Sequence, residues 1–174
     1  MSVKVQFEMY VDNDQCLSED VIMTNIDIYR SGIIQMSNSI GSIEGSIVIS
    51  SSNIPNKSIK IEDNLGALTQ RLCYEGVRKL IVQQSVEITF FTYYAKLTLE
   101  PKDEFITVSG DYVPDDIKFT RSTLLPALFY CGKRYLKVLR LLAKYESHYP
   151  KRLIEIEELA KVTEQDLRNA KIIL

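Results

Sequence analysis

The segment VEITFFTYYAKLTLE, residues 86–100, indicates that this chain contains β-structure. Its apolar residues alternate as in a β-strand, where successive side chains point to opposite faces. Phe90 and Phe91 fit buried positions, because large apolar side chains are mostly buried. Tyr93 and Tyr94 fit a surface position, where a tyrosine buries contact area at low entropic cost. We predict one long strand with two candidate contact tyrosines.

This strand continues into an amphipathic hairpin. The segment FITVSG, residues 105–110, returns along it after a turn at EPKDE. A register that places Leu99 opposite Ile106 and Leu97 opposite Val108 puts the apolar side chains of both strands on one face. The hairpin is therefore predicted to cover a core with that face.

The first sixty residues also read as strands. The clearest alternation is VKVQFEMYVD, residues 3–12. We predict that residues 21–37 continue it as two further strands around a turn at Ser31–Gly32. The remaining strands are predicted at residues 42–50 and 59–62, with a polar loop between them.

The apolar spacing then changes to that of a helix in two segments. In residues 62–84, a stripe of leucines is capped by Asp63 or Asn64, and Gly76 on that stripe suggests a close approach to the sheet. In residues 118–147, Pro126 fits a first turn, with Ser122 or Thr123 as the cap. The second stripe consists of Leu125, Leu128, Gly132, Tyr135, Leu139 and Leu142.

Near the end of the chain, Thr163 and Asp166 form a capping-box pattern, which predicts the start of a new short helix. Two short helices would then resemble a helix-turn-helix. We predict an α+β fold, in which an antiparallel sheet carries two main helices on one face and a short C-terminal helical segment follows. The expected division is an α+β domain, residues 1–147, and a helical appendix, residues 148–174.

Composition bounds the class of protein. The 174 residues are 45% hydrophobic and 25% charged, as in ordinary globular proteins. No apolar run approaches the roughly 20 residues of a membrane span, and we see no secretory signal. Cys16, Cys73 and Cys131 fit neither a zinc site nor a compact disulfide framework. We expect free thiols in a reducing cytoplasm.

No motif for catalysis stands out. His148 is the only histidine, and it lies in a polar segment before a proline, which favours a capping or solvent-exposed role. The chain lacks nucleophile-elbow, phosphate-loop, dinucleotide-binding and metalloprotease patterns. We therefore expect a protein that is not an enzyme and that uses no cofactor and no metal.

Charge is divided unevenly along the chain. Residues 1–120 carry 10 Lys and Arg against 17 Asp and Glu, a net of −7, whereas residues 121–174 carry 11 against 6, a net of +5. Clustered charge can steer a partner of opposite sign. The candidate protein-contact residues are Tyr93, Tyr94, Glu100, Asp103, Glu104, Asp111, Asp115 and Asp116. A basic helix stripe could be a solvated face or a nucleic-acid contact, and consists of Lys133, Lys137, Arg140 and Lys144.

The order of elements over residues 60–145 carries a resemblance. A helix at NLGALTQRLCYEGVRKL is followed by a hairpin at YAKLTLEPKDEFITVSG and a helix at FTRSTLLPALFYCGKRYLKVLRLL. This order resembles small bacterial immunity-like proteins, which block a cognate toxin in the cytoplasm. The resemblance implies a non-catalytic protein that binds one protein partner, such as a basic toxin domain. The short apolar runs predict no membrane partner. The alternative function is a nucleic-acid-binding regulator that uses the basic stripe and the C-terminal helices.

Overall fold

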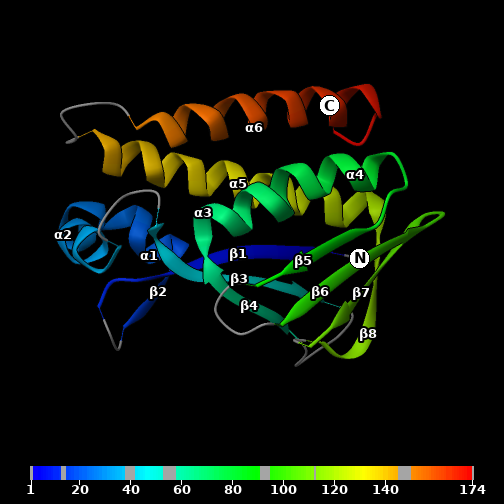
Figure 1. The fold of residues 1–174 in the computed structure, drawn as a ribbon, viewed down its shortest axis with the longest axis horizontal. Coiled ribbons are helices and arrows are strands. Elements are labelled where there is room, and N and C mark those ends of the chain that lie inside the picture. The colour runs from blue at the N-terminus through cyan, green and yellow to red at the C-terminus, as the bar shows by residue number, and fades with distance from the viewer. Residues whose placement is uncertain are drawn as a thin grey trace.

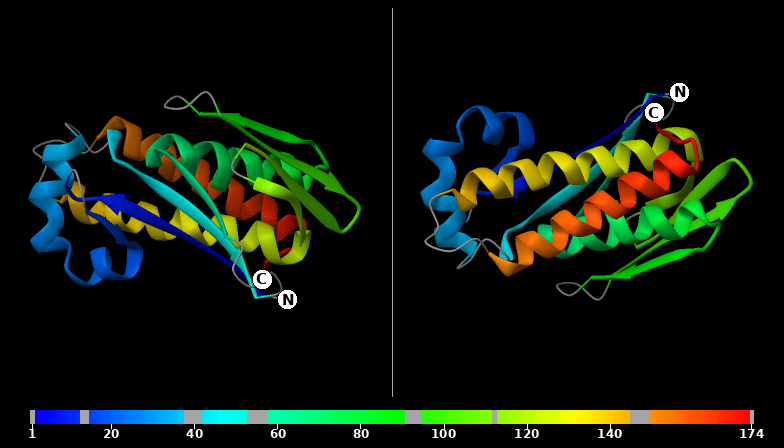
Figure 2. Two further views of the ribbon diagram at one scale, coloured as in Figure 1. Left: turned by 90° about the horizontal axis from the view of Figure 1, so that it is seen from below. Right: turned by 90° about the horizontal axis from the view of Figure 1, so that it is seen from above.

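The computed structural model describes residues 2–12, 15–37, 42–52, 58–90, 95–111, 113–144 and 150–173 (Figure 1). The α+β class is confirmed, but the strands form two antiparallel sheets of four strands each rather than one. Both sheets lie on the same side of the central helices, and the last helix lies on the other side of those helices (Figures 1 and 2). Within the described ranges, no helix is both long and apolar enough to span a membrane.

The first sheet has the strand order β2-β1-β3-β4. Its strands are β1 (Val3–Tyr10), β2 (Cys16–Ser18), β3 (Glu44–Ser51) and β4 (Ser58–Asn64). The alternation predicted for β1 is confirmed, since Val5, Phe7 and Met9 are buried while Lys4 is exposed. The strands predicted at residues 42–50 and 59–62 correspond to β3 and β4.

The prediction of strands over residues 21–37 is wrong, because this segment forms helices α1 (Glu19–Thr24) and α2 (Ile26–Ser37). Ile22 and Ile33 are buried, whereas Ile28, which the strand pattern would bury, is 72% exposed. The spacing of Ile22, Ile26 and Ile33 also fits one face of a helix. A tertiary contact favours the helix, since Glu19 in its first turn accepts a hydrogen bond from Arg134 Nε at 2.9 Å.

The first predicted main helix is confirmed as a continuous helical run over residues 65–81. It consists of α3 (Leu65–Leu68), the π-helix η2 (Thr69–Gly76) and α4 (Val77–Ile81). The predicted cap is also confirmed, because Asn64 Oδ1 accepts from Ala67 N at 2.9 Å. A Cβ at Gly76 would lie 2.7 Å from the carbonyl oxygen of Arg71 and 3.5 Å from Val86 Cγ1. Gly76 therefore mainly accommodates the wide turn of its own helix, with the sheet at ordinary contact distance.

The second sheet has the strand order β5-β6-β7-β8. Its strands are β5 (Val86–Thr89), β6 (Lys96–Lys102), β7 (Phe105–Gly110) and β8 (Val113–Thr120). The single long strand predicted for residues 86–100 is wrong, because β5 and β6 pair antiparallel, with Val86 opposite Leu99. Chain reversal between them lets Ile88 and Leu97 share the buried face although their sequence parity differs.

The hairpin of β6 and β7 is confirmed with a different register. Leu99 lies opposite Val108, and Leu97 lies opposite Gly110, so the pairing is shifted by two residues from the prediction. A shift of two keeps every side chain on its face. Accordingly Leu97, Leu99, Ile106 and Val108 are all buried, as predicted. The turn is shorter than expected, because β6 runs to Lys102.

The second predicted main helix is α5 (Arg121–Ala143), and its whole predicted stripe is buried. Pro126 is the sixth residue of α5 rather than part of the first turn. The cap position is Thr120 rather than Ser122 or Thr123. The Thr123 hydroxyl instead donates to the Thr120 carbonyl at 3.0 Å.

The last helix is α6 (Lys151–Asn169), a single helix of 19 residues. The two short helices and the helix-turn-helix predicted here are wrong. Thr163 is fully buried in mid-helix, and its hydroxyl donates to the Leu159 carbonyl at 2.7 Å, so it does not cap a new helix. Leu153, Ile156 and Leu167 of α6 join the same hydrophobic core as the sheets. The domain boundary at residue 147 stays a prediction.

Candidate functional site

The acidic residues predicted to form one contact surface are divided between the two ends of β7. Asp103 and Glu104 lie at the turn before this strand, and Asp111 lies at the turn after it. The six residues of β7 between them place these turns more than about 20 Å apart. Asp115 and Asp116 belong to β8 rather than to the predicted loop.

The remaining predicted contact residues lie elsewhere. Glu100 is exposed on β6, opposite Thr107. Tyr93 and Tyr94 lie outside the described residues, as does His148. The first two therefore stay predictions, and the proposed capping role of His148 also stays untested.

The basic stripe of α5 lies beside α6, and two of its members pair with that helix. Lys133 Nζ lies 3.0 Å from Glu164 Oε2, and Arg140 Nε lies 2.7 Å from Glu157 Oε1. Lys137 and Lys144 are exposed. The stripe therefore serves in part to fasten the two helices to each other.

Three turns meet at the end of the molecule that carries Asp103 and Glu104. Within the ranges that the structure covers, the non-glycine residues with positive φ are Gln83 at 60°, Asp103 at 54° and Lys171 at 56°. Gln83 follows α4, Lys171 follows α6, and Asp103 forms the hairpin turn, so each is at a chain reversal where glycine is the usual residue. Gln83 Nε2 donates to the Asp103 carbonyl at 3.3 Å and joins two of the turns.

Unfavourable backbone conformations of this kind cluster at functional sites in proteins. The presence of Gln83, Asp103 and Lys171 at one end makes that end a candidate functional site. The sequence patterns contain no signal for this arrangement, because the three turns are brought together only by the packing of α4, α6 and the hairpin.

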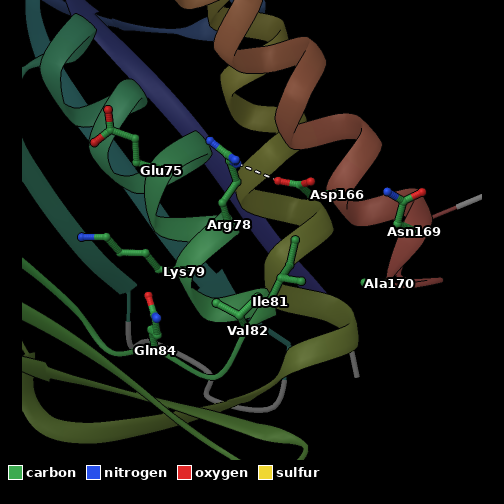
Figure 3. Close-up of a pocket in the computed structure, with 9 residues that line it drawn as sticks. All are labelled: Glu75, Arg78, Lys79, Ile81, Val82, Gln84, Asp166, Asn169 and Ala170. Carbon is green, nitrogen blue, oxygen red and sulfur yellow. Dashed lines mark hydrogen bonds and ion pairs between the residues drawn. The ribbon is translucent and has the colours of Figure 1, made fainter.

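A groove of about 620 Å³ opens beside these turns, between α4 and α6 (Figure 3). Arg78 of α4 points toward Asp166 of α6, with 2.6 Å between Nε and Oδ2. Val82, at the end of α4, is 61% exposed and gives the groove an apolar surface. We call this the α4–α6 groove. Its lining residues are Glu75, Arg78, Lys79, Ile81, Val82, Gln84, Asp166, Asn169 and Ala170.

A second hollow of about 350 Å³ adjoins the groove through Ala170, which lines both. It contains Asp103 and Glu104, the two predicted contact residues that this site takes up. The other residues lining this second hollow are Thr120, Arg121, Ser122, Ala170, Lys171 and Ile172.

Arg121 connects the walls of the second hollow to the groove. Its backbone N–H donates to the Glu104 carbonyl at 2.7 Å, and its guanidinium donates to the carbonyl of Ile81 at the end of α4. The second hollow, the hairpin turn and α4 are thereby fixed relative to one another. Such a surface presents a preformed shape, which lowers the entropic cost of binding.

The lining of the groove carries charged side chains and amides. Its two carboxylates are engaged, since Asp166 pairs with Arg78 and Glu75 accepts from Gln70 Nε2 at 2.7 Å. The groove has no histidine, cysteine or tyrosine in its lining. Over the described residues, no group of three or more His, Cys, Asp or Glu side chains is placed to hold a metal ion. The lining therefore offers charged, amide and apolar groups for contact with a partner.

A polar network on the outer face of the first sheet was missed by the sequence patterns. Lys60 of β4 lies 3.1 Å from Glu8 of β1 and 3.2 Å from Glu62. The Ser46 hydroxyl donates to Glu8 at 3.1 Å, and the Cys16 thiol contacts Glu8 at 3.9 Å. These residues are far apart in sequence, and only the register of the strands brings them together.

The surroundings of this network raise the pKa values of Cys16 and Lys60. Burial and the neighbouring Glu8 carboxylate raise the pKa of Cys16 to about 11, so the thiol stays protonated near neutral pH. Burial alone would lower the pKa of Lys60, but its hydrogen bonds to Glu8 and Glu62 raise it, so the amine stays charged. We interpret the network as a cross-strand support of the sheet.

Comparison of the chain with family models, with curated proteins and with solved structures finds no match. The fold and the site alone define an α+β protein with a groove between α4 and α6 at one end. The function below is therefore argued from the geometry of this chain.

Proposed function

We propose that this protein is a non-catalytic protein-binding module of the immunity type, which inhibits a bacterial toxin in the cytoplasm. Its contact surface is the α4–α6 groove together with the second hollow. The single observation that carries the proposal is the convergence of three left-handed turns around two adjoining hollows, at the end where Asp103 and Glu104 are exposed.

The chemistry of the surface supports a protein rather than a small metabolite as the partner. Protein interfaces combine an apolar centre with a polar rim and hydrogen-bonding groups. Val82 supplies exposed apolar area, and Gln84 and Asn169 supply amide donors and acceptors. Asp103 and Glu104 add negative charge at the edge, which would steer a basic partner and speed its association.

The nucleic-acid alternative keeps one supporting observation, the exposure of Lys137 and Lys144 on α5. Two other members of the basic stripe are neutralised by Glu164 and Glu157. Residues 151–169 form one helix, so the recognition element of a helix-turn-helix is missing from this segment. Few cations then remain to contact phosphates, and the protein partner is the better-supported function.

The proposal can be tested by affinity capture from the native source with a matched pair of variants. Val82→Arg places bulk and charge in the groove, whereas Ile28→Arg makes the same kind of change at an aliphatic residue of α2 that is 72% exposed. In Figure 1, α2 lies at the opposite end of the molecule from the end of α4. We expect one protein to be captured by the wild type and by Ile28→Arg but not by Val82→Arg.

The captured protein must also be toxic when it is produced alone in bacteria. A captured protein that binds Val82→Arg as well as the wild type would contradict the assignment of the groove. A non-toxic partner would contradict the inhibitor function while leaving the binding surface in place.

A further inference from the structure

Two thiols meet inside the core, away from the groove. Cys73 of η2 is fully buried, and Cys131 of α5 is 1% exposed. Cys73 Cβ lies 2.9 Å from the place that a Cβ would take on Gly132, the residue after Cys131, so the two cysteines are neighbours in the core. Their positions are 58 residues apart in the chain, so the contact is made by the packing of the π-helix against α5.

A glycine next to Cys131 makes this approach possible. A Cβ at Gly132 would lie 2.9 Å from Cys73 Cβ and 2.9 Å from Tyr74 Cζ. Contacts this short are essentially never seen for a real Cβ, so any larger residue would push η2 away from α5. Gly132 therefore holds the two cysteine-bearing backbones at close range.

We propose that Cys73 and Cys131 are a redox pair, which oxidation closes into an intramolecular disulfide that locks η2 onto α5. The Glu75 end of η2 lines the α4–α6 groove, and η2 leads directly into α4. Oxidation thus fixes the α4 wall of the groove to the longest helix of the protein. This inference stands whether or not the groove binds a protein.

The chemistry requires an external two-electron oxidant, either a peroxide or a low-molecular-weight disulfide such as glutathione disulfide. One thiol loses its proton, and its sulfur attacks the oxidant to give a sulfenic acid or a mixed disulfide. The second sulfur then forms the S–S bond and displaces water or a glutathione thiol. In total the two thiols lose two protons and two electrons, and one peroxide becomes two waters or one glutathione disulfide becomes two thiols.

Burial makes this a gated reaction. Contact with Cys131 and burial both raise the pKa of the Cys73 thiol well above its ordinary value, which leaves little thiolate at neutral pH. The oxidant therefore reacts when η2 separates transiently from α5, and the pair responds to sustained rather than brief oxidation. Closing a loop of this length restricts the unfolded chain, so the disulfide should raise Tm by roughly 5 °C or more.

The test uses the full chain with Cys16→Ser, which leaves only the two core thiols. The reduced protein is incubated with glutathione disulfide well below its Tm. We expect an intact mass lower by two hydrogens, the loss of both titratable thiols, a monomer on a non-reducing gel and a higher Tm. Hydrogen exchange should slow over η2 and α4, and a peptide map should join residue 73 to residue 131.

A matched control adds Cys131→Ala, which should give no internal crosslink and no rise in Tm under the same treatment. Cys73→Ala provides a second control in case the first variant folds poorly. Two thiols that stay free in the folded protein, but that oxidise once the protein is unfolded, would overturn the proposal. So would products that are only glutathione adducts or crosslinked dimers.

Discussion

Arg78 on α4 and Asp166 on α6 stand 88 positions apart and form an ion pair with 2.6 Å between Nε and Oδ2. The pair joins the two walls of the α4–α6 groove (Figure 3). Both side chains are partly exposed, so solvent screens the attraction, and pairs of this kind contribute about 0.2–1 kcal/mol. Its main consequence is to set the spacing of the walls.

Replacement of this carboxylate tests how α6 is held. Asp166→Ala should lower the free energy of unfolding by about 0.5–1 kcal/mol, with a smaller loss at high salt. Urea denaturation measures the loss. Glu158→Ala is the control, because Glu158 pairs with Lys161 on the same exposed face of α6 and joins no second element. Equal losses in the two variants would contradict a bridging role for Asp166.

Truncation of a core leucine tests the helix stripe of α5. Leu139 is 2% exposed, so Leu139→Ala should cost about 2–5 kcal/mol of unfolding free energy. Lys137→Ala, on the exposed side of the same helix, should cost less than about 0.5 kcal/mol. Denaturant unfolding of the two variants decides the matter, and similar small losses would show that the stripe does not face the core.

The pH dependence of stability tests the seam between α5 and α6. The hydrogen bond from Lys133, with a second from Arg168, lowers the pKa of Glu164 below its ordinary value of 4.5. A lowered folded-state pKa contributes stability above the unfolded value, and this stability is lost as pH falls through the folded value. Glu164→Gln should therefore lower Tm by about 1–3 °C near pH 7. The difference should shrink as pH falls below 4.5 and through the lowered folded-state pKa of Glu164.

A control separates this effect from general loss of charge. Glu155 on α6 has only longer contacts, at 4.0 Å to Lys151 and 3.7 Å to Arg152. Glu155→Gln should change Tm less than Glu164→Gln does near pH 7. Thermal unfolding followed by circular dichroism over the acid range measures both, and a difference for Glu164→Gln that does not shrink as pH falls would contradict the ionic origin.

A helix or strand can be predicted from the sequence when its apolar pattern alone, without contacts to distant residues, determines its structure. The stripe from Leu125 to Leu142 has one helical period over many turns, and the whole of α5 follows from it. Residues 21–37 fit both a strand and a helix, and the helix is favoured by the contact of Glu19 with Arg134, which no local pattern contains. Thr163 matches a capping box by letter but is buried in mid-helix, so burial decided its role.

The candidate site was predictable only in part for the same reason. Asp103 and Glu104 are predicted from the sequence as contact residues at the hairpin turn, and both line the second hollow. The groove itself combines α4 with α6, and Val82 and Asn169 have no feature in the sequence that marks them. The predicted acidic contact residues fall into two groups. The β6–β7 turn is short, and β8 includes Asp115 and Asp116.

Gel-shift titration tests the nucleic-acid alternative. Because Lys133 and Arg140 are paired with α6, we expect no shift of mixed duplex DNA at low salt with up to about 50 µM protein, a concentration at which ordinary non-specific binders associate. The control is a variant with alanine at all four positions of the basic stripe. Tight binding by the wild type that this variant loses would favour the nucleic-acid function.

We propose that the α4–α6 groove binds and neutralises a toxic protein. The most direct measurement is the growth of bacteria that produce the captured partner together with the wild type, Val82→Arg or Ile28→Arg, at matched protein levels. We expect growth with the wild type and with Ile28→Arg, and growth arrest with Val82→Arg. Growth that is restored equally by all three proteins would contradict the groove as the inhibitory surface, and arrest with all three would contradict the inhibitor function.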